Sequence, residues 1–234
     1  MGAEWSPNGR MLVYSVIWRK RTDLYVMGPD GSQKRRLTIG AKRDGGARWS
    51  PDGRKIAFNR YTGNSAHIYV INADGTNLRA LTHGGELDGD PSWSPDGRRI
   101  AFDRFYGGPG QSDLFVMTAA GRSQRKLTST PNASESFPEW SPSGPTIAFL
   151  FGTAREQRVD VIESDGSRQR TLARNATEVS ALSWDRTARR ITFVGHIDSA
   201  HQSPTEIFTA RVNENRPVRM TRNELFEETP QWHP

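Results

Sequence analysis

Six of the seven tryptophans recur at nearly constant spacing, at Trp5, Trp49, Trp93, Trp140, Trp184 and Trp232. The intervals between them are 44, 44, 47, 44 and 48 residues, and a Ser-Pro-x-Gly sequence directly follows the first four. A period of about 40 to 50 residues is typical of repeat architectures, in which one unit cannot bury its apolar surface alone. The repeat therefore constrains the fold more than any other feature of the chain.

The local sequence within each repeat predicts four β-strands. In Ser-Pro-Asp-Gly, Pro presets φ at the second turn position and Gly suits the fourth, which predicts a tight reversal between antiparallel strands. In the second repeat this turn precedes an apolar run at residues 56–58, a third strand at 68–71, an Asp-Gly turn and a fourth strand ending in Leu81 and Thr82. Helical solenoids would instead show apolar residues at a 3.6-residue spacing. We therefore predict an all-β fold, a β-propeller of four-stranded antiparallel blades.

The number of repeats leaves two forms of propeller open. Five repeats are complete, and a sixth contributes only one strand at the C-terminal end. We expect a single β-propeller domain over residues 1–234, with repeats at about 1–44, 45–88, 89–135, 136–179 and 180–227 and a partial sixth at 228–234. The chain then forms either a five-bladed ring or an incomplete six-bladed ring that belongs to a longer parent protein.

The third repeat carries the motif that identifies a family. The run Pro-x-Trp-Ser-Pro-Asp-Gly-x-x-Ile-Ala-Phe at residues 91–102 resembles the propeller repeat of the TolB family, and the resemblance covers nearly the whole chain. It implies a non-enzymatic scaffold that binds a protein or peptide partner, as TolB of the cell-envelope Tol-Pal system does. It also implies a periplasmic or otherwise exported protein. The chain as given shows no basic-then-apolar signal peptide, so the cytoplasm stays open as an alternative.

Candidate partner-binding residues follow from the same resemblance. It places the loops between the second and third strands of each blade at one mouth of the central tunnel. These loops combine arginine with aromatic side chains, which protein interfaces enrich at their hot spots. The candidates are Trp18, Arg19, Arg60, Tyr61, Arg104, Tyr106, Arg155 and His196. The alternative is that these residues form ordinary solvated loop tips.

Acidic residues recur five positions before a tryptophan, at Asp44, Asp88, Glu135 and Glu227. Equivalent positions of successive blades converge on the propeller axis, so an acidic ring there could hold a hard cation through oxygen ligands, with Ca²⁺ the expected ion. The alternative is that these carboxylates cap turns or accept hydrogen bonds from nearby backbone amides.

Charge and motif content narrow the class of function. Lys and Arg number 32 against 26 Asp and Glu, giving a net charge of +6, but several basic runs lie at or near the expected fourth strands, where charge blunts an exposed edge. We therefore do not expect a nucleic-acid partner.

The chain has no Cys, no Gly-x-Ser-x-Gly and no His-Glu-x-x-His, so we expect no enzyme. The alternative is a carbohydrate-active or metal-assisted enzyme that uses the tunnel-mouth carboxylates. No apolar run is long enough for membrane insertion, and we expect a monomer.

Overall fold

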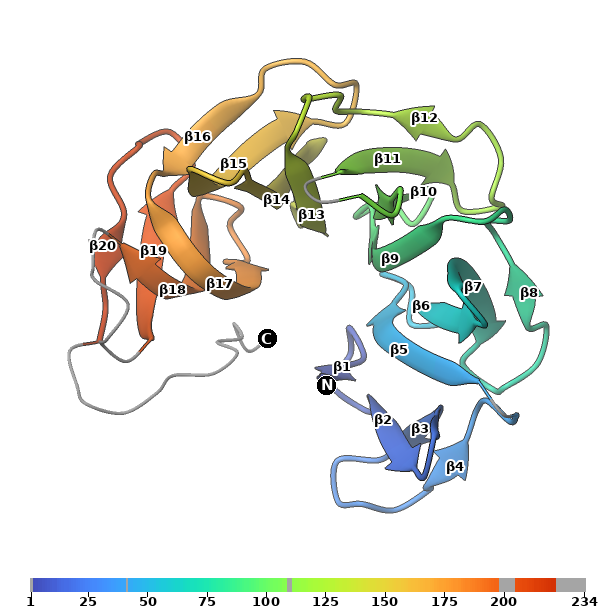
Figure 1. Cartoon of the computed structure of the whole chain (residues 1–234). Helices are drawn as coiled ribbons and strands as arrows, with labels where there is room; N and C mark the ends of the chain where they lie inside the picture. Colours follow the sequence, from blue (N-terminus) through green and yellow to red (C-terminus); the bar gives the residue numbers. More distant parts are fainter. Residues whose placement is uncertain (1, 41, 109–110, 198–204, 222–234) are drawn as a thin grey trace. The chain divides into compact units, whose positions relative to one another are not determined.

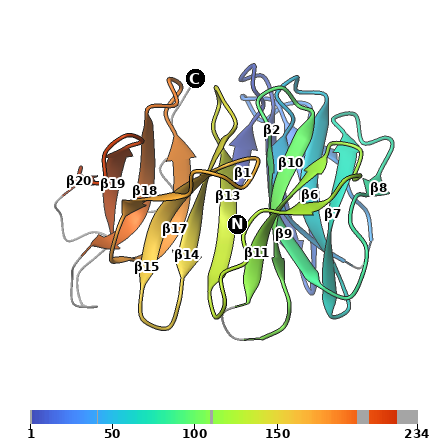
Figure 2. The same cartoon turned by 90° about the horizontal axis from the view of Figure 1, so that it is seen from above.

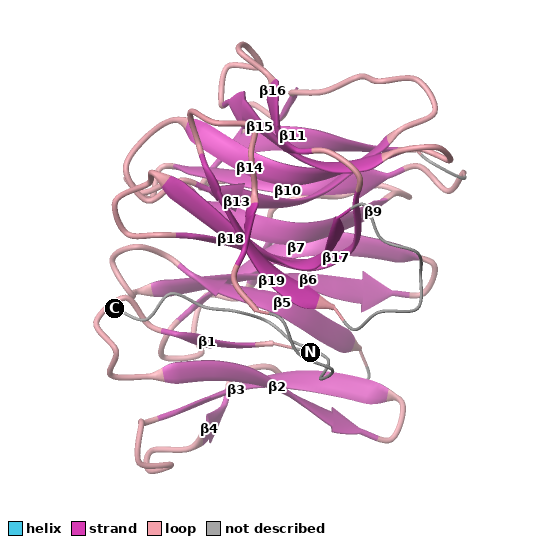
Figure 3. Ribbon diagram, turned by 90° about the vertical axis from the view of Figure 1, so that its left-hand side faces the viewer, coloured by secondary structure: helices cyan, strands magenta, loops and turns pink. Residues whose placement is uncertain are grey.

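The computed structural model describes residues 2–40, 42–108, 111–197 and 205–221. These residues form strands and loops and contain no helix (Figure 3), and therefore none long and apolar enough to cross a membrane. The chain divides into two compact units. The first is Met1–Gly108 with Phe115–Lys126, and the second is Pro109–Leu114 with Leu127–Pro234. The single domain over 1–234 stays a prediction.

The strands of the described residues come in five successive groups of four, each of which we call a blade (Figure 1). Blade 1 holds β1 (Ala3–Trp5), β2 (Leu12–Trp18), β3 (Arg21–Met27) and β4 (Arg35–Arg36), and blade 2 holds β5 (Arg43–Trp49), β6 (Lys55–Thr62), β7 (Ser65–Asn72) and β8 (Arg79–Ala80). Blade 3 holds β9 (Leu87–Trp93), β10 (Arg99–Phe105), β11 (Ser112–Thr118) and β12 (Arg125–Lys126), and blade 4 holds β13 (Ser134–Trp140), β14 (Thr146–Gly152), β15 (Gln157–Glu163) and β16 (Arg170–Ala173). Blade 5 holds β17 (Ala176–Trp184), β18 (Arg190–Ile197), β19 (Glu206–Arg211) and β20 (Val218–Arg219).

Within a blade, consecutive strands pair antiparallel, as the turn chemistry predicted. In blade 2, Ile56 of β6 stands opposite Trp49 of β5 and Ile71 of β7, and β7 pairs in turn with the short strand β8. Blade 5 repeats the pattern through β17, β18, β19 and β20, and Figure 2 shows β17, β18 and β19 side by side. The all-β fold of four-stranded antiparallel units is therefore confirmed.

The Ser-Pro-Asp-Gly sequence forms the tight reversal expected of it. The Gly53 amide donates to the Ser50 carbonyl over 2.8 Å, and Gly53 has a φ of 67°, in the left-handed region that glycine tolerates best. The Ser50 hydroxyl donates to Asp52 Oδ1 (2.6 Å) and accepts from the Lys55 amide (2.9 Å). In the diverged fifth copy Ala188 occupies the glycine position with a φ of 54°, a conformation that costs an L-residue about 1–2 kcal/mol.

The apolar cores lie between neighbouring blades, as the repeat argument requires. In the first unit, Trp49 and Phe58 of blade 2 share a buried cluster with Val13 and Leu24 of blade 1. Blades 2 and 3 share a corresponding buried cluster, which includes Trp93 and Phe102 of blade 3. The second unit follows the same rule between blades 4 and 5, where the buried cluster includes Val159, Leu172, Trp184, Phe193 and Phe208. Each tryptophan of these clusters thus contributes to the core between its own blade and the preceding one.

Hydrogen bonds reinforce these contacts between neighbouring blades. The indole N–H of Trp93 donates to the Arg48 carbonyl over 3.2 Å, and that of Trp184 donates to the Glu139 carbonyl over 2.9 Å. Arg35, from a basic run assigned to edge protection, donates to the carbonyl of Ala73 in the next blade over 2.6 Å. Some of the basic residues near the outer strands therefore link blades to one another.

The Leu-Thr end of the fourth strand has a specific role. The Thr82 hydroxyl is fully buried and accepts a hydrogen bond from the Ile68 amide of β7 over 2.9 Å. Thr38, Thr128 and Thr221 accept the equivalent bond in their blades, each over 2.9 Å. The hydroxyl thus satisfies a main-chain donor at the point where the short fourth strand ends.

Candidate functional site

In blades 2 to 5, the start of the first strand lies beside the end of the second strand. In blade 2, Arg43 pairs with Tyr61 and Asp44 with Arg60. A β-bulge follows, with Gly46 at a φ of 58°. A Cβ atom at Gly46 would lie 2.5 Å from Asn59 Oδ1, so both the backbone conformation and the space favour glycine here.

A cleft of about 930 Å³ opens at this end of blades 1 and 2, within the first unit. We call it the basic cleft, and its main lining residues are Ile17, Arg19, Lys20, Arg21, Arg43, Gly46 and Tyr61. Arg19 and Lys20 form the tip of the β2–β3 hairpin, because Trp18 pairs with Arg21. Four cationic side chains therefore line one cavity, whose volume is within the range typical of ligand sites.

Exposed apolar side chains accompany these cations. Ile17 is 49% exposed, Trp18 next to the cleft is 60% exposed and Tyr61 is 41% exposed. The guanidinium carbon of Arg43 lies 5.7 Å from the centre of the Tyr61 ring, at cation–π distance. Two of the predicted partner-binding residues, Arg19 and Tyr61, thus line this cleft, and Trp18 precedes Arg19 in the chain.

Arg60 does not project from a loop, which corrects the expectation for this residue. Its side chain is 7% exposed, and it donates two hydrogen bonds to Asp44, with Nε–Oδ1 and Nη2–Oδ2 distances of 2.6 and 2.8 Å. The guanidinium also lies over the rings of Phe58 and Tyr69, at 5.4 and 4.9 Å. The hydrogen bonds to Asp44 raise the pKa of Arg60.

Arg104 repeats this arrangement in blade 3 and corrects the same expectation. It donates to both carboxylate oxygens of Asp88, over 2.6 and 3.1 Å, and lies over Phe102 and Phe115. Its side chain is only 14% exposed. The signal for both pairs is in the sequence, because each arginine follows its aspartate by sixteen residues and stands opposite it in the register.

The acidic residues predicted to bind a cation together each have different contacts. Asp44 and Asp88 each bind an arginine, Glu135 is fully buried opposite Phe151, and Glu227 lies outside the described residues. In the part of the chain that the structure describes, no group of three or more His, Asp or Glu side chains could hold a metal ion. A Ca²⁺ site at these positions stays a prediction that the observed contacts do not favour.

Two neighbouring acidic residues in blade 3, Asp90 and Asp103, were not predicted from the sequence as a site. Asp90 occupies the bulge of β9 with a φ of 45°, at the position that Gly46 holds in blade 2, and Asp103 lies on β10. Burial raises the pKa of both carboxyls, and the charge of Asp90 raises that of Asp103 further. Asp103 Oδ1 is buried and has no hydrogen-bond partner among the described residues.

The remaining predicted contacts differ in exposure. Tyr106 in the first unit is 43% exposed, with the Lys126 ammonium 5.5 Å from its ring centre. In the second unit, Arg155 is exposed in the turn after β14. His196 is only 4% exposed, because it belongs to strand β18 rather than to a loop, and its Nε2 lies 3.2 Å from Glu178 Oε2. His196 is therefore not a surface contact.

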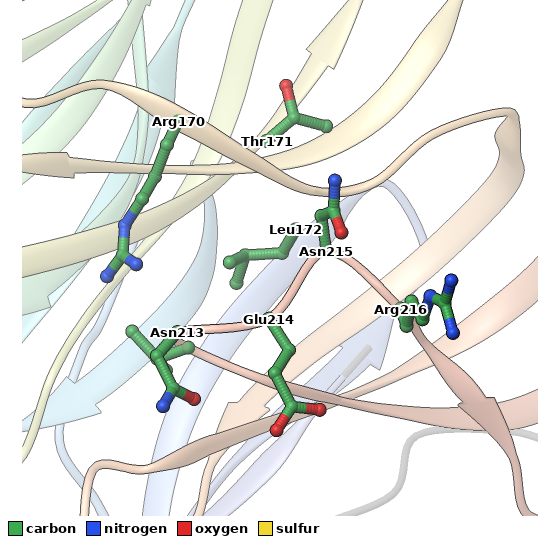
Figure 4. A pocket seen from close by; sticks show the side chains of 8 residues that line it. Arg170, Thr171, Leu172, Asn213, Glu214, Asn215 and Arg216 are labelled. Carbon is green, nitrogen blue, oxygen red and sulfur yellow. The ribbon is translucent and has the colours of Figure 1, made fainter.

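The second unit has a smaller cavity of about 530 Å³ (Figure 4). Arg170 and Leu172 of β16 lie on one side of it, and the turn after β19 supplies the residues 212–216 on the other. Glu214 in this turn pairs with Arg211 over 3.0 Å, and both side chains are about half exposed. No exposed aromatic residue lines the cavity, so it has fewer features of a recognition site than the basic cleft.

Comparison with known proteins identifies the family. The model of the TolB beta propeller domain matches residues 1–188. The chain belongs to the TolB β-propeller family. TolB of Acinetobacter baumannii superposes with a TM-score of 0.74 and 18% identity, over 94% of this chain and 54% of that one. A structure assigned as TolB of Agrobacterium tumefaciens gives a TM-score of 0.75 and 18% identity, over 93% of this chain and 78% of that one.

Enzymes share the TolB-like propeller at lower identity. The oligogalacturonate lyase of Vibrio parahaemolyticus has a TM-score of 0.69 and 13% identity, over 92% of this chain and 63% of that chain. These identities establish the fold alone. The chain spans about half of the Acinetobacter TolB, and no curated protein sequence matches it.

Proposed function

We propose that this TolB-family propeller is a non-enzymatic scaffold that binds a protein or peptide partner at the basic cleft. The observation that carries the proposal is the joint exposure of Ile17 and Tyr61 in the lining of a 930 Å³ cleft. Large apolar side chains that stay exposed beside cations are typical of interface hot spots. Family resemblance supports an exported, periplasmic location for this activity.

The rival function is a carbohydrate-active or metal-assisted enzyme built on carboxylates at the same end of the blades. Its support is weaker because two of the carboxylates available for acid–base work, Asp44 and Asp88, are occupied by bidentate contacts with arginine. Such bidentate contacts take up the oxygen atoms of a carboxylate. Turnover of a carbohydrate that Asp88→Asn abolishes while the fold persists would reverse this preference.

The proposal can be tested without knowing the natural partner. Peptides selected from a random display library on the folded chain should lose most of their affinity for Ile17→Ala and Tyr61→Ala, because truncation of a hot-spot anchor typically costs about 2 kcal/mol or more. Leu78→Ala is a matched control, since Leu78 is 42% exposed in the same unit but does not line the cleft. Selected peptides that bind the two cleft variants as tightly as the wild type would refute the proposal.

A further inference from the structure

The turn at the tip of the β2–β3 hairpin can form without the two positive charges that it carries. Blade 2 builds the equivalent hairpin, closed by the pairing of Thr62 with Ser65, from Gly63 and Asn64, residue types that favour tight turns. Blade 1 has Arg19 and Lys20 at this place, and Arg19 adopts a left-handed φ of 57°. The two positive charges therefore call for an explanation other than turn formation.

The charges of the cleft are not balanced by carboxylates. Among the described residues, no ion pair involves Arg19, Lys20 or Arg43, and Arg21 has only a long contact of 3.8 Å with Asp23. The one carboxylate that lines the cleft, Asp44, already binds Arg60. The cleft thus concentrates positive charge that a ligand of opposite sign would neutralise.

Exposed backbone also lines the cleft, at Gly46. Gly46 occupies the bulge of β5, whereas the equivalent position carries a side chain in Asp90 of blade 3 and in Phe137 of blade 4. The exposed backbone of Gly46 therefore lines the cleft with no side chain of its own, and Asn59 Oδ1 occupies the place that a Cβ would take. An extended peptide can approach such a backbone closely.

From these three observations we infer that the partner of the basic cleft presents an acidic peptide segment, whose carboxylates contact Arg19, Lys20 and Arg43. This inference rests on the proposed function and specifies its ligand. Single-stranded nucleic acid is the other anionic polymer to consider, and it fits less well. It binds by stacking bases on aromatic rings, and the Arg43 guanidinium already lies over the Tyr61 ring, 5.7 Å from its centre.

The double variant Arg19→Gly/Lys20→Asn tests the inference directly, because it installs the tip that blade 2 already uses and should therefore fold. The probe is fluorescein-labelled decaglutamate, measured by fluorescence anisotropy at low ionic strength. We expect the double variant to weaken binding about tenfold, since two charge contacts of partly exposed side chains are lost. The matched control is Arg10→Gln/Arg54→Gln, which removes two exposed charges from turns that follow β1 and β5.

The outcomes separate the inference from the proposed function. Two results together support a local acidic-peptide site. The control variant should bind decaglutamate with an affinity within about twofold of the wild type, and wild-type binding should weaken when salt is raised from about 50 to 300 mM. The inference is overturned if Arg19→Gly/Lys20→Asn binds decaglutamate like the wild type, if the control loses as much, or if labelled decathymidylate binds more tightly and shows the same dependence. If displayed peptides still require Ile17 and Tyr61 while decaglutamate does not bind, the proposed function stands and only the acidic chemistry fails.

Discussion

The Asp44–Arg60 pair allows a quantitative prediction about what holds the binding face together. The two side chains are 2% and 7% exposed, so removing either partner leaves a charge with little access to water. Loss of one member of a buried ion pair typically costs about 3–5 kcal/mol. In Asp44→Ala the guanidinium keeps its contacts with the rings of Phe58 and Tyr69, so we place that variant near the lower bound, about 3 kcal/mol. Arg60→Ala loses those contacts as well and should cost about 4–5 kcal/mol.

The measurement is the free energy of unfolding from urea titration, followed by circular dichroism, for both single variants and the double variant. The double variant should be less destabilised than the sum of the single changes by about 2–3 kcal/mol, because it leaves no unpaired buried charge. Glu214→Ala is the surface control. Glu214 pairs with Arg211 over 3.0 Å, but the side chains are 46% and 57% exposed, so the loss should stay below about 1 kcal/mol. A cost for Asp44→Ala as small as that of Glu214→Ala would refute the reasoning.

Three further predictions concern residues that the repeat places in special surroundings. Thr82→Val should lower the free energy of unfolding by about 1–3 kcal/mol in urea titration, because it leaves the buried amide of Ile68 without its acceptor. Asp103→Asn should raise the melting temperature near pH 8 and leave it unchanged below about pH 4. Burial and the charge of Asp90 raise the pKa of Asp103. The fold is therefore most stable while Asp103 is neutral, and this stability is lost as pH rises through the raised pKa. Asparagine stays neutral at every pH and avoids this loss. Ala188→Gly should stabilise the chain by about 0.5–1 kcal/mol in the same urea assay, since glycine adopts the left-handed φ without strain.

Each of these changes has a control in the chain. Thr76→Val removes an exposed turn hydroxyl and should change stability by no more than about 0.5 kcal/mol. Asp30→Asn should show the opposite pH trend to Asp103→Asn, because hydrogen bonds from Ser32 lower the pKa of Asp30. Gly53→Ala should destabilise the chain, as the reverse of Ala188→Gly, since Gly53 has a φ of 67°. A melting temperature of Asp103→Asn that follows the wild type at every pH would contradict the burial argument.

The strands and turns of this protein could be predicted from its sequence because they depend on local chemistry. The Ser50-to-Gly53 reversal follows from residue types within four positions, and the burial of Trp49 and Trp184 between blades follows from the repeat itself. Loss of the motif at Ala188 did not change the turn, since the Ala188 amide still donates to the Asp185 carbonyl over 3.0 Å. The surrounding blade therefore imposes a conformation that the local sequence no longer favours.

The site was harder to predict because it depends on the register between strands. The acidic residues were assigned to a cation site on the axis, and the arginines were assigned to partner-binding loops. In the structure, Asp44 stands directly opposite Arg60. A bulge in the first strand decides which side chains face each other there, and a residue list does not show where a bulge lies. His196 was misplaced for a related reason, since β18 extends to Ile197 and keeps it within the strand. Arg19 and Tyr61 could each be placed near a hairpin end from the strand patterns alone, and their role in partner binding stays a prediction.

Hydrogen–deuterium exchange with a bound, display-selected peptide tests the central claim most directly. If the partner occupies the basic cleft, the amides of the β2–β3 tip around Lys20 and of the first residues of β5 around Gly46 should exchange more slowly in the complex. The turns around Arg10 and Arg54 should exchange at unchanged rates. Protection confined to those turns, or to the second unit, with none at Lys20 and Gly46, would contradict the account.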